Sequence, residues 1–162
     1  MMSHIWTVYL SGEIHTDWRE QIMNASNTQK LPMRFVSAVT NHGASDAAGD
    51  VLGDVPAGFL RDQQSARVNA MRTQSLIRQC DVAVIRFGNQ YKQWNAAFDA
   101  GYCAALGKPY ITLHDDDIIH PLKEVDGASQ GWATTPEQVV DILRYVTGDP
   151  DANGTHAGTR PL

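Results

Sequence analysis

Short apolar runs alternate along the chain with longer segments in which apolar residues recur every three or four positions. The short runs are rich in β-branched and aromatic residues and therefore predict strands. They lie at 5–10, 33–39, 81–87 and 109–114, with a short fifth candidate at 131–135. The periodic segments predict helices at 17–26, 59–80, 94–106 and 135–148. The acidic stretch 115–130 fits a short helix.

Several residues indicate where these elements begin and end. Asp17 followed by Glu20 predicts a capping box at the start of the first helix. Gly107 predicts the end of the third helix. Thr135 before Pro136 predicts the start of the last helix, because threonine caps well and proline suits the first helical position.

Two segments lack any periodicity. Residues 40–58 are rich in Gly, Asp and Ala, and a loop of that length in a compact domain is usually functional or mobile. Residues 148–162 are rich in Gly, Pro, Asp and Thr and predict a disordered tail. No internal repeat is visible, so we expect one domain over residues 1–147.

The alternation of strands and helices predicts an α/β fold. We expect a Rossmann-like three-layer sandwich, with a mostly parallel five-stranded sheet covered by helices on both faces. In such sheets ligands bind beyond the carboxyl ends of the strands. The residues expected at that edge are Ser11, Gly12, Glu13 and His15, and the segments 40–43, 88–93 and 114–117.

Composition narrows the classes of partner. The chain has 162 residues, 43% of them hydrophobic, which suits one globular domain. Its formal net charge is −5 and it has no basic run, which argues against a nucleic-acid polymer or an anionic membrane surface. No apolar segment approaches the roughly 20 residues of a membrane helix, and no signal peptide is evident, so we expect a cytoplasmic protein. Cys80 and Cys103 form no CxxC pair and are expected to be buried thiols.

One acidic residue, Asp99, lies within the otherwise uncharged helix WNAAFDAGYCAAL. Aspartate is a weak helix former, so it marks either a solvated stripe or a reactive carboxylate held in a pocket. Its small neighbours Ala96, Ala100 and Gly101 would let a ligand or the sheet approach the helix closely. The pattern alone leaves both interpretations open.

Polar residues near other element ends are further candidates. Glu13 and His15 follow the first strand, and Gly12 would let the chain turn or a ligand approach, although an ordinary polar loop has the same composition. Arg72, beside Asn69 on the second predicted helix, could reach an anionic group such as a phosphate.

The sequence gives little support for a metal centre, and three common ligand-binding or catalytic motifs are absent from it. His114, the run 115–117 and His120 are chemically suitable metal ligands, but their spacing matches no structural zinc pattern, and acidic residues commonly cap helices. We assign no metal site. The chain lacks GxGxxG, a Walker loop and GxSxG, which argues against a dinucleotide site, a P-loop and a serine hydrolase elbow.

Three segments resemble the nucleoside 2-deoxyribosyltransferase superfamily and, within it, the YtoQ family. They are VYLSGEIH, DVAVIRF and QWNAAFDAGYCAALGKPYITLH. The resemblance covers Tyr9 to Tyr145 and is strongest over 81–114, where a strand and loop lead to acid-x-Gly-Tyr and a Gly-Lys-Pro stop. It implies a flavodoxin-like fold, no cofactor, and a homo-oligomer, a dimer or larger, in which a neighbouring subunit completes each active site.

The resemblance also implies roles for single residues. The acidic residue before x-Gly-Tyr is the nucleophile of the transferases and falls on Asp99, and the tyrosine that positions it falls on Tyr9. The chain departs from the pattern in three places: the nucleophile is Asp instead of Glu, and two further acidic residues are replaced by Gln93 and Thr73. Aspartate is one methylene shorter than glutamate, so the reactive oxygen moves. This matters because attack requires that oxygen to lie about 3–3.5 Å from the sugar carbon. Glu13 is the candidate acid for the leaving base.

The implied substrate is a (deoxy)nucleoside or nucleotide. Its expected contacts are Gly12, His15, Asn69, Arg72, Gly88, Gln93, Trp94, Asn95 and His114. A carboxylate nucleophile at Asp99 would break the N-glycosidic bond through a covalent sugar ester. Attack by a second base gives transfer and attack by water gives hydrolysis. The departures from the pattern leave a third interpretation, a catalytically inactive binding or sensor protein on the same fold.

Overall fold

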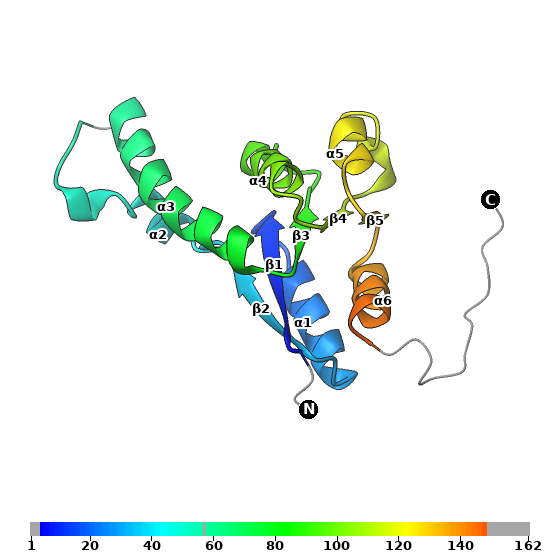
Figure 1. Cartoon of the computed structure of the whole chain (residues 1–162). Coiled ribbons are helices and arrows are strands. Elements are labelled where there is room, and N and C mark those ends of the chain that lie inside the picture. Colours follow the sequence, from blue (N-terminus) through cyan, green and yellow to red (C-terminus); the bar gives the residue numbers. More distant parts are fainter. Residues whose placement is uncertain (1–3, 57, 149–162) are drawn as a thin grey trace.

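The computed structural model describes residues 4–56 and 58–148. Five parallel strands form one sheet in the order β2-β1-β3-β4-β5. The strands are β1 (Trp6–Gly12), β2 (Met33–Ser37), β3 (Val82–Arg86), β4 (Tyr110–Leu113) and β5 (Gly131–Ala133). This order is that of flavodoxin-like folds, and it confirms the fold class and all five predicted strands. Figure 1 shows the strands side by side across the molecule.

Helices cover both faces of the sheet. On one face lie α1 (Trp18–Thr28) and α6 (Pro136–Thr147), which pack on a core that includes Val8, Leu10 and Val84. On the other face lie α3 (Phe59–Gln79), α4 (Trp94–Ala105) and α5 (Lys123–Gly127), over a core that includes Tyr9 and Ile85. Alternate residues of each strand therefore serve opposite cores. In Figure 1, α4 and α5 lie above the sheet and α1 and α6 below it.

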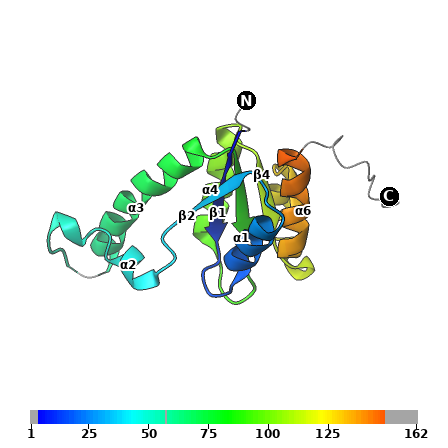
Figure 2. The same cartoon turned by 90° about the horizontal axis from the view of Figure 1, so that it is seen from below.

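The longest helix, α3, reaches well beyond the sheet. Its buried residues are Ser65 and Ile77, and much of the remaining surface is exposed. Figure 2, viewed at right angles to Figure 1, shows the amino-terminal half of α3 extending outward with α2 beside it. Within the described residues no helix combines the length and apolar character needed to span a membrane.

The predicted long loop 40–58 is wrong in part, because it contains α2 (His42–Asp46) and the 3-10 helix η1 (Asp50–Leu52). Asn41 caps α2 by accepting a hydrogen bond from the Ala44 N–H at 2.8 Å. Ser65 of α3 binds the turn between α2 and η1. Its hydroxyl accepts a hydrogen bond from the Gly49 N–H at 3.2 Å and donates one to the Asp46 carbonyl at 2.6 Å. Contacts with a distant helix therefore order this segment.

Two predicted caps are confirmed and one is wrong. Thr135 accepts a hydrogen bond from the Gln138 N–H at 3.3 Å, and Gly107 has a φ of +65° just after α4. Asp17 does precede α1, but its side chain makes no capping bond. Its carboxylate accepts from the Gln21 side chain at 2.8 Å instead, so the predicted capping box is absent.

The remaining predictions concern the acidic stretch, the cysteines and the tail. Residues 115–130 hold the 3-10 helix η2 (Asp116–Ile118) and α5, which confirms a short helix there. Cys80 and Cys103 are both buried free thiols, as predicted, and burial raises the pKa of Cys103 to about 12. Residues 149–162 lie outside the described residues, so the disordered tail and the domain limit at 147 stay predictions.

Candidate active site

Two hydroxyl groups from β1 bind the carboxylate of Asp99 on α4. The Ser11 Oγ donates a hydrogen bond to Asp99 Oδ2 at 2.6 Å, and the Tyr9 hydroxyl lies 3.4 Å from the same oxygen. Residues 9 and 11 point to the same face of the sheet because side chains alternate along a strand. The face they share is the one covered by α4. The sheet thereby joins residues that lie 88 and 90 positions apart in the sequence.

Asp99 is buried, with 8% of its surface exposed, so the interpretation as a solvated stripe is wrong. Burial raises the pKa of Asp99, and the hydrogen bonds from Ser11 and then Tyr9 act against that rise. None of the ion pairs among the described residues includes Asp99. Burial also raises the pKa of Tyr9, and the nearby negative charge of Asp99 adds to this, so Tyr9 stays a neutral donor.

Two glycines allow the corner after β1 to close against β3. Gly12 has a φ of +108°, and a Cβ there would lie 2.0 Å from the Arg86 carbonyl oxygen. The same carbonyl accepts the Glu13 N–H at 3.1 Å. A Cβ on Gly88 would lie 2.7 Å from Glu13 Cγ. Of the two roles predicted for Gly12, the structure shows the chain turn. The group that lies close to Gly12 is the backbone of the neighbouring strand β3.

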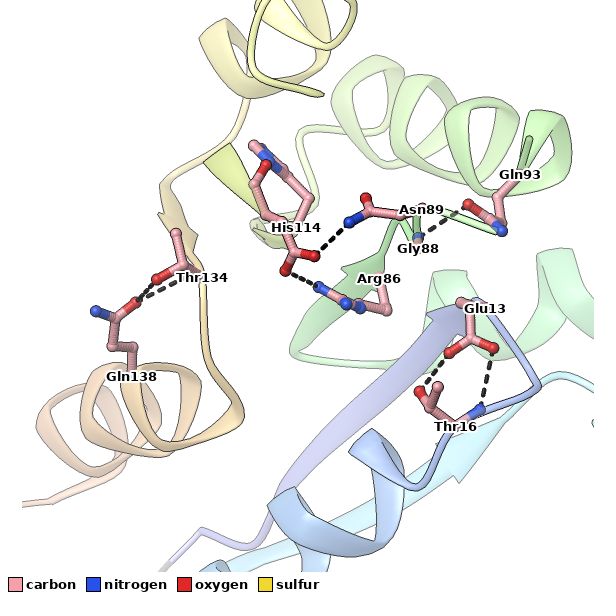
Figure 3. Close-up of polar contacts among 10 residues, drawn as sticks. Glu13, Thr16, Arg86, Gly88, Asn89, Gln93, His114, Thr134 and Gln138 are labelled. Carbon is pink, nitrogen blue, oxygen red and sulfur yellow. Dashed lines mark hydrogen bonds and ion pairs between the residues drawn. The ribbon is translucent and has the colours of Figure 1, made fainter. Parts of the chain in front are cut away.

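The Glu13 carboxylate organises the loop that leads into α1. Its Oε1 accepts from the backbone N–H groups of His15 and Thr16, the latter at 3.1 Å, and its Oε2 accepts from the Thr16 hydroxyl at 2.5 Å. Figure 3 shows the Thr16 contacts. The guanidinium of Arg19 donates to the carbonyls of Gly12 and Glu13, which fixes the same loop from the helix side. Glu13 is buried, and both of its oxygens already have donors.

The loop after β3 is held by Gln93, the residue that precedes α4. Its Oε1 accepts the Gly88 N–H at 2.9 Å (Figure 3). Trp94 and Asn95 open α4 and are exposed, Trp94 by 72%. Within this loop the ring of Tyr91 lies 4.8 Å from that of His15, measured between centroids. The loops after β1 and β3 therefore meet, as their place at one edge of the sheet predicts.

Three other residues predicted to contact the substrate, Asn69, Arg72 and His114, bind other parts of the protein. On α3, Asn69 donates to the Ser45 carbonyl at 2.9 Å, and Arg72 reaches the Ser37 carbonyl at 3.3 Å. These bonds join α3 to the end of β2 and to α2. His114, at the end of β4, is 1% exposed, and its Nε2 lies 2.9 Å from the Asp126 carboxylate of α5.

The chemistry of a metal site is lacking in the part of the chain that the structure describes. Across residues 4–56 and 58–148, no group of three or more His, Cys, Asp or Glu side chains could hold a metal ion. His114 is engaged with Asp126, and His120 is exposed. The run 115–117 enters a 3-10 helix, and Asp115 binds Asn89 at 2.5 Å and Arg86 at 3.5 Å.

A cavity of about 210 Å³ opens at the same edge of the sheet, on the face covered by α1 and α6. Arg86, Trp18 and Thr134 are part of its lining. Arg86 has a buried Nε without a hydrogen-bond partner among the described residues. Figure 3 shows its guanidinium between the loop of Glu13 and the start of α6. Because side chains alternate along β3, this cavity lies on the sheet face opposite Asp99.

Sequence reasoning placed Ser11 at the correct edge but gave it no role. The signal that could have identified it is the alternation along β1, which puts residue 11 on the same face as Tyr9. Tyr91 and Arg19 carried no such signal. Each is placed by a contact with the loop after β1, and such contacts leave no periodic pattern in the sequence.

Comparisons with known proteins agree with this fold. Residues 9–147 match the family model described as nucleoside 2-deoxyribosyltransferase YtoQ. The uncharacterized protein YtoQ of Bacillus subtilis (strain 168) is 39% identical over 140 residues, which are 86% of this chain and 95% of that protein. Two solved structures, each 13% identical, share the fold. A conserved protein from Enterococcus faecalis V583 has a TM-score of 0.59 over 88% of this chain and 99% of its own. A 2-deoxyribosyltransferase from Bacillus psychrosaccharolyticus has a TM-score of 0.50 over 90% and 94%. The chain therefore belongs to the nucleoside 2-deoxyribosyltransferase YtoQ family.

Proposed function

We propose that this protein cleaves or exchanges the N-glycosidic bond of (deoxy)nucleosides, with Asp99 as the nucleophile. The observation that carries the proposal is the buried Asp99 carboxylate, which has two hydroxyl partners and no cation beside it within the described residues. Desolvation of this kind strengthens a carboxylate nucleophile, and perturbed carboxyl groups cluster at functional sites. The description of the family as a transferase supports the same chemistry.

The reaction follows the logic of a retaining glycosidase. An Asp99 oxygen attacks the anomeric carbon, the C–N bond breaks, and its electron pair leaves with the base. The base takes a proton as it leaves, and a covalent sugar ester remains on Asp99. A second base attacking this ester gives exchange, whereas water gives hydrolysis. The mechanism requires no metal or redox cofactor.

Glu13 is the candidate acid for the leaving base. It lies in the corner where β1 ends, and it packs against Gly88 at the end of β3. To act as the acid, Glu13 would exchange the hydrogen bond from the Thr16 hydroxyl for one to a ring nitrogen of the base. That exchange leaves the Thr16 backbone N–H on Oε1, so the loop keeps one of its anchors.

Residues at the start of α4 are the proposed contacts of the sugar and base. The amide oxygen of Gln93 binds Gly88, so its amide nitrogen is the group left to donate to a sugar hydroxyl. Asn95 and Trp94 are exposed beside it, and Trp94 offers a stacking surface for a base. His15, in the loop after β1, lies against Tyr91 of the loop after β3. A phosphate, if the substrate is a nucleotide, would be met by Arg72.

We also propose that the protein is a homo-oligomer whose subunits complete one another's sites. Trp94 and Phe98 lie four residues apart on α4 and are 72% and 66% exposed, so they share one exposed apolar face of that helix, which is the proposed interface. A second copy would cover this surface and enclose the substrate. Light scattering of Phe98→Asp should show fewer subunits than wild type. An unchanged subunit number would remove Phe98 from the interface. Placement in the cytoplasm remains a prediction.

The proposal is tested by a base-exchange assay. The protein is incubated with deoxyinosine and adenine, and deoxyadenosine and hypoxanthine are separated by chromatography. Asp99→Asn is the test variant, and Asp141→Asn, an exposed carboxylate on α6, is the matched control. Deoxyadenosine formed by wild type and Asp141→Asn but not by Asp99→Asn is the expected result.

Other outcomes separate the alternatives. Hypoxanthine without deoxyadenosine identifies a hydrolase that uses the same nucleophile. Binding of nucleosides or nucleotides without any product identifies a sensor on the same fold and contradicts the enzymatic proposal. Full activity of Asp99→Asn removes Asp99 from the chemistry.

A further inference from the structure

We infer that Ser11 is the principal positioning residue of the nucleophile: its hydroxyl holds Asp99 Oδ2 and leaves Oδ1 as the attacking oxygen. This inference rests on the proposed function, since it assigns parts within that active site. It also revises the expectation drawn from family resemblance, in which the tyrosine of the first strand positions the carboxylate.

The two hydrogen bonds to Asp99 differ in strength. The bond from Ser11 Oγ to Oδ2 is 2.6 Å long, within the range of strong O–H···O⁻ bonds. The Tyr9 hydroxyl is 3.4 Å from the same atom, which is beyond the usual length of an O–H···O bond. Ser11 is therefore the dominant donor, and Tyr9 contributes a weaker contact from the same strand.

Both donors reach the same carboxylate oxygen. The hydrogen bonds of Asp99 within the described residues involve Oδ2, and none involves Oδ1. Asp99 keeps 8% of its surface exposed, and Oδ1 is not among the fully buried polar atoms that lack a partner, so this oxygen stays accessible. A carboxylate with one oxygen held by hydroxyls and the other free has a defined direction of attack.

Ser11 itself is rigidly held. It is 2% exposed, and it lies opposite Ile85 in the ladder between β1 and β3, two inner strands of the sheet. The next residue, Gly12, is fixed against the Arg86 carbonyl. A hydroxyl on such a strand keeps its position without help from substrate, which is the condition for a pre-organised site.

The same hydrogen bond serves both halves of the reaction. As Oδ1 bonds to the anomeric carbon, the C–N bond breaks and its electron pair goes to the base nitrogen. Oδ2 becomes the carbonyl oxygen of the ester, and Ser11 keeps its proton. When the second base or water attacks the sugar carbon, its N–H or O–H proton passes to Glu13, which gave up a proton in the first half, and the Oδ1–carbon bond breaks so that its electron pair restores the carboxylate. Ser11 then stabilises the charge that returns to Oδ2.

The electrostatics of the site agree with this role. Burial raises the pKa of Asp99, and the hydrogen bond from Ser11 is the largest effect that lowers it again. The other groups facing this carboxylate are Tyr9 from β1 and Cys103 from α4, and Thr73 of α3 lies beside the Tyr9 hydroxyl. None of these groups is a cation, so within the described residues no positive charge would take the place of the Ser11 hydroxyl.

The test compares Ser11→Ala with Ser11→Cys and with Thr7→Val. Alanine removes the donor, cysteine keeps the volume with a weaker donor, and Thr7→Val removes another buried hydroxyl of β1 whose partner is Arg34. The carboxyl carbon of Asp99 is titrated by NMR, with Asp99→Asn to assign its signal. The pKa of Asp99 should rise in Ser11→Ala, rise less in Ser11→Cys and stay unchanged in Thr7→Val.

Kinetics supply the second measurement. The acid limb of the pH profile of kcat/KM should move to higher pH in Ser11→Ala, with kcat falling roughly 10- to 100-fold at low pH and KM little changed. A titration and a profile of Ser11→Ala that coincide with wild type would overturn the inference. Wild type without turnover contradicts the proposed function itself, and the two failures are thereby distinguished.

Discussion

The corner at Gly12 gives a prediction whose size follows from the structure. In Gly12→Ala the new Cβ would lie 2.0 Å from the Arg86 carbonyl oxygen, whereas real Cβ atoms keep at least 3.0 Å, so β1 and β3 must separate there by about 1 Å. A φ of +108° costs an alanine about 1–3 kcal/mol. Loss of the Glu13 N–H bond to the same carbonyl adds about 1–3 kcal/mol.

The expected loss for Gly12→Ala is therefore about 2–6 kcal/mol of unfolding free energy, measured by urea denaturation. That is a large part of the roughly 5–15 kcal/mol typical of a domain. The matched control is Gly101→Ala in α4, where a Cβ meets nothing within 4 Å. It should stabilise the protein by about 0.5–1 kcal/mol. A Gly12→Ala variant within about 0.5 kcal/mol of wild type would show that the close approach of β1 and β3 at this corner does not constrain the fold.

Two further predictions concern the carboxylates of Asp99 and Asp126. Because burial raises the pKa of Asp99, its contribution to stability is full below the unfolded pKa of about 3.9 and is lost as pH rises through the folded pKa. Asp99→Asn should therefore unfold at higher urea than wild type at neutral pH, with the gap closing as pH falls; a constant gap would contradict this sign. Asp126→Ala leaves the buried His114 and Thr112 without their partner, and should cost about 2–4 kcal/mol by the same measurement. A loss below about 0.5 kcal/mol would show that water replaces the carboxylate.

The inner strands of the sheet were predictable because they are buried on both faces. Such strands read as continuous apolar runs, and the runs around Val84 and Ile111 are of this kind. The alternation with helices then fixed a parallel arrangement. The helix α2 was not predictable, because five residues are too few to show a period and their order depends on Ser65 in a later helix.

The candidate site was predictable in its place but not in its contacts. The position of Asp99 on α4 follows from the sequence, whereas its burial depends on a strand 88 residues away. The amide of Gln93 and the imidazole of His114 are groups that a ligand would suit equally well. In the structure the Gln93 amide binds Gly88 and the His114 imidazole binds Asp126. Only folding brings these partners together. When a side chain could bind several partners, the sequence alone does not indicate which partner it binds.

In the proposed reaction Asp99 carries the sugar between the two steps. The most direct measurement is mass spectrometry of wild type and Asp99→Asn after incubation with deoxyinosine alone and quenching with acid. We expect a deoxyribosyl group on the wild-type peptide that contains Asp99, absent from the variant, and removed by adenine with formation of deoxyadenosine. Consumption of deoxyinosine with the sugar attached to another residue, or with no attachment at all, would contradict it.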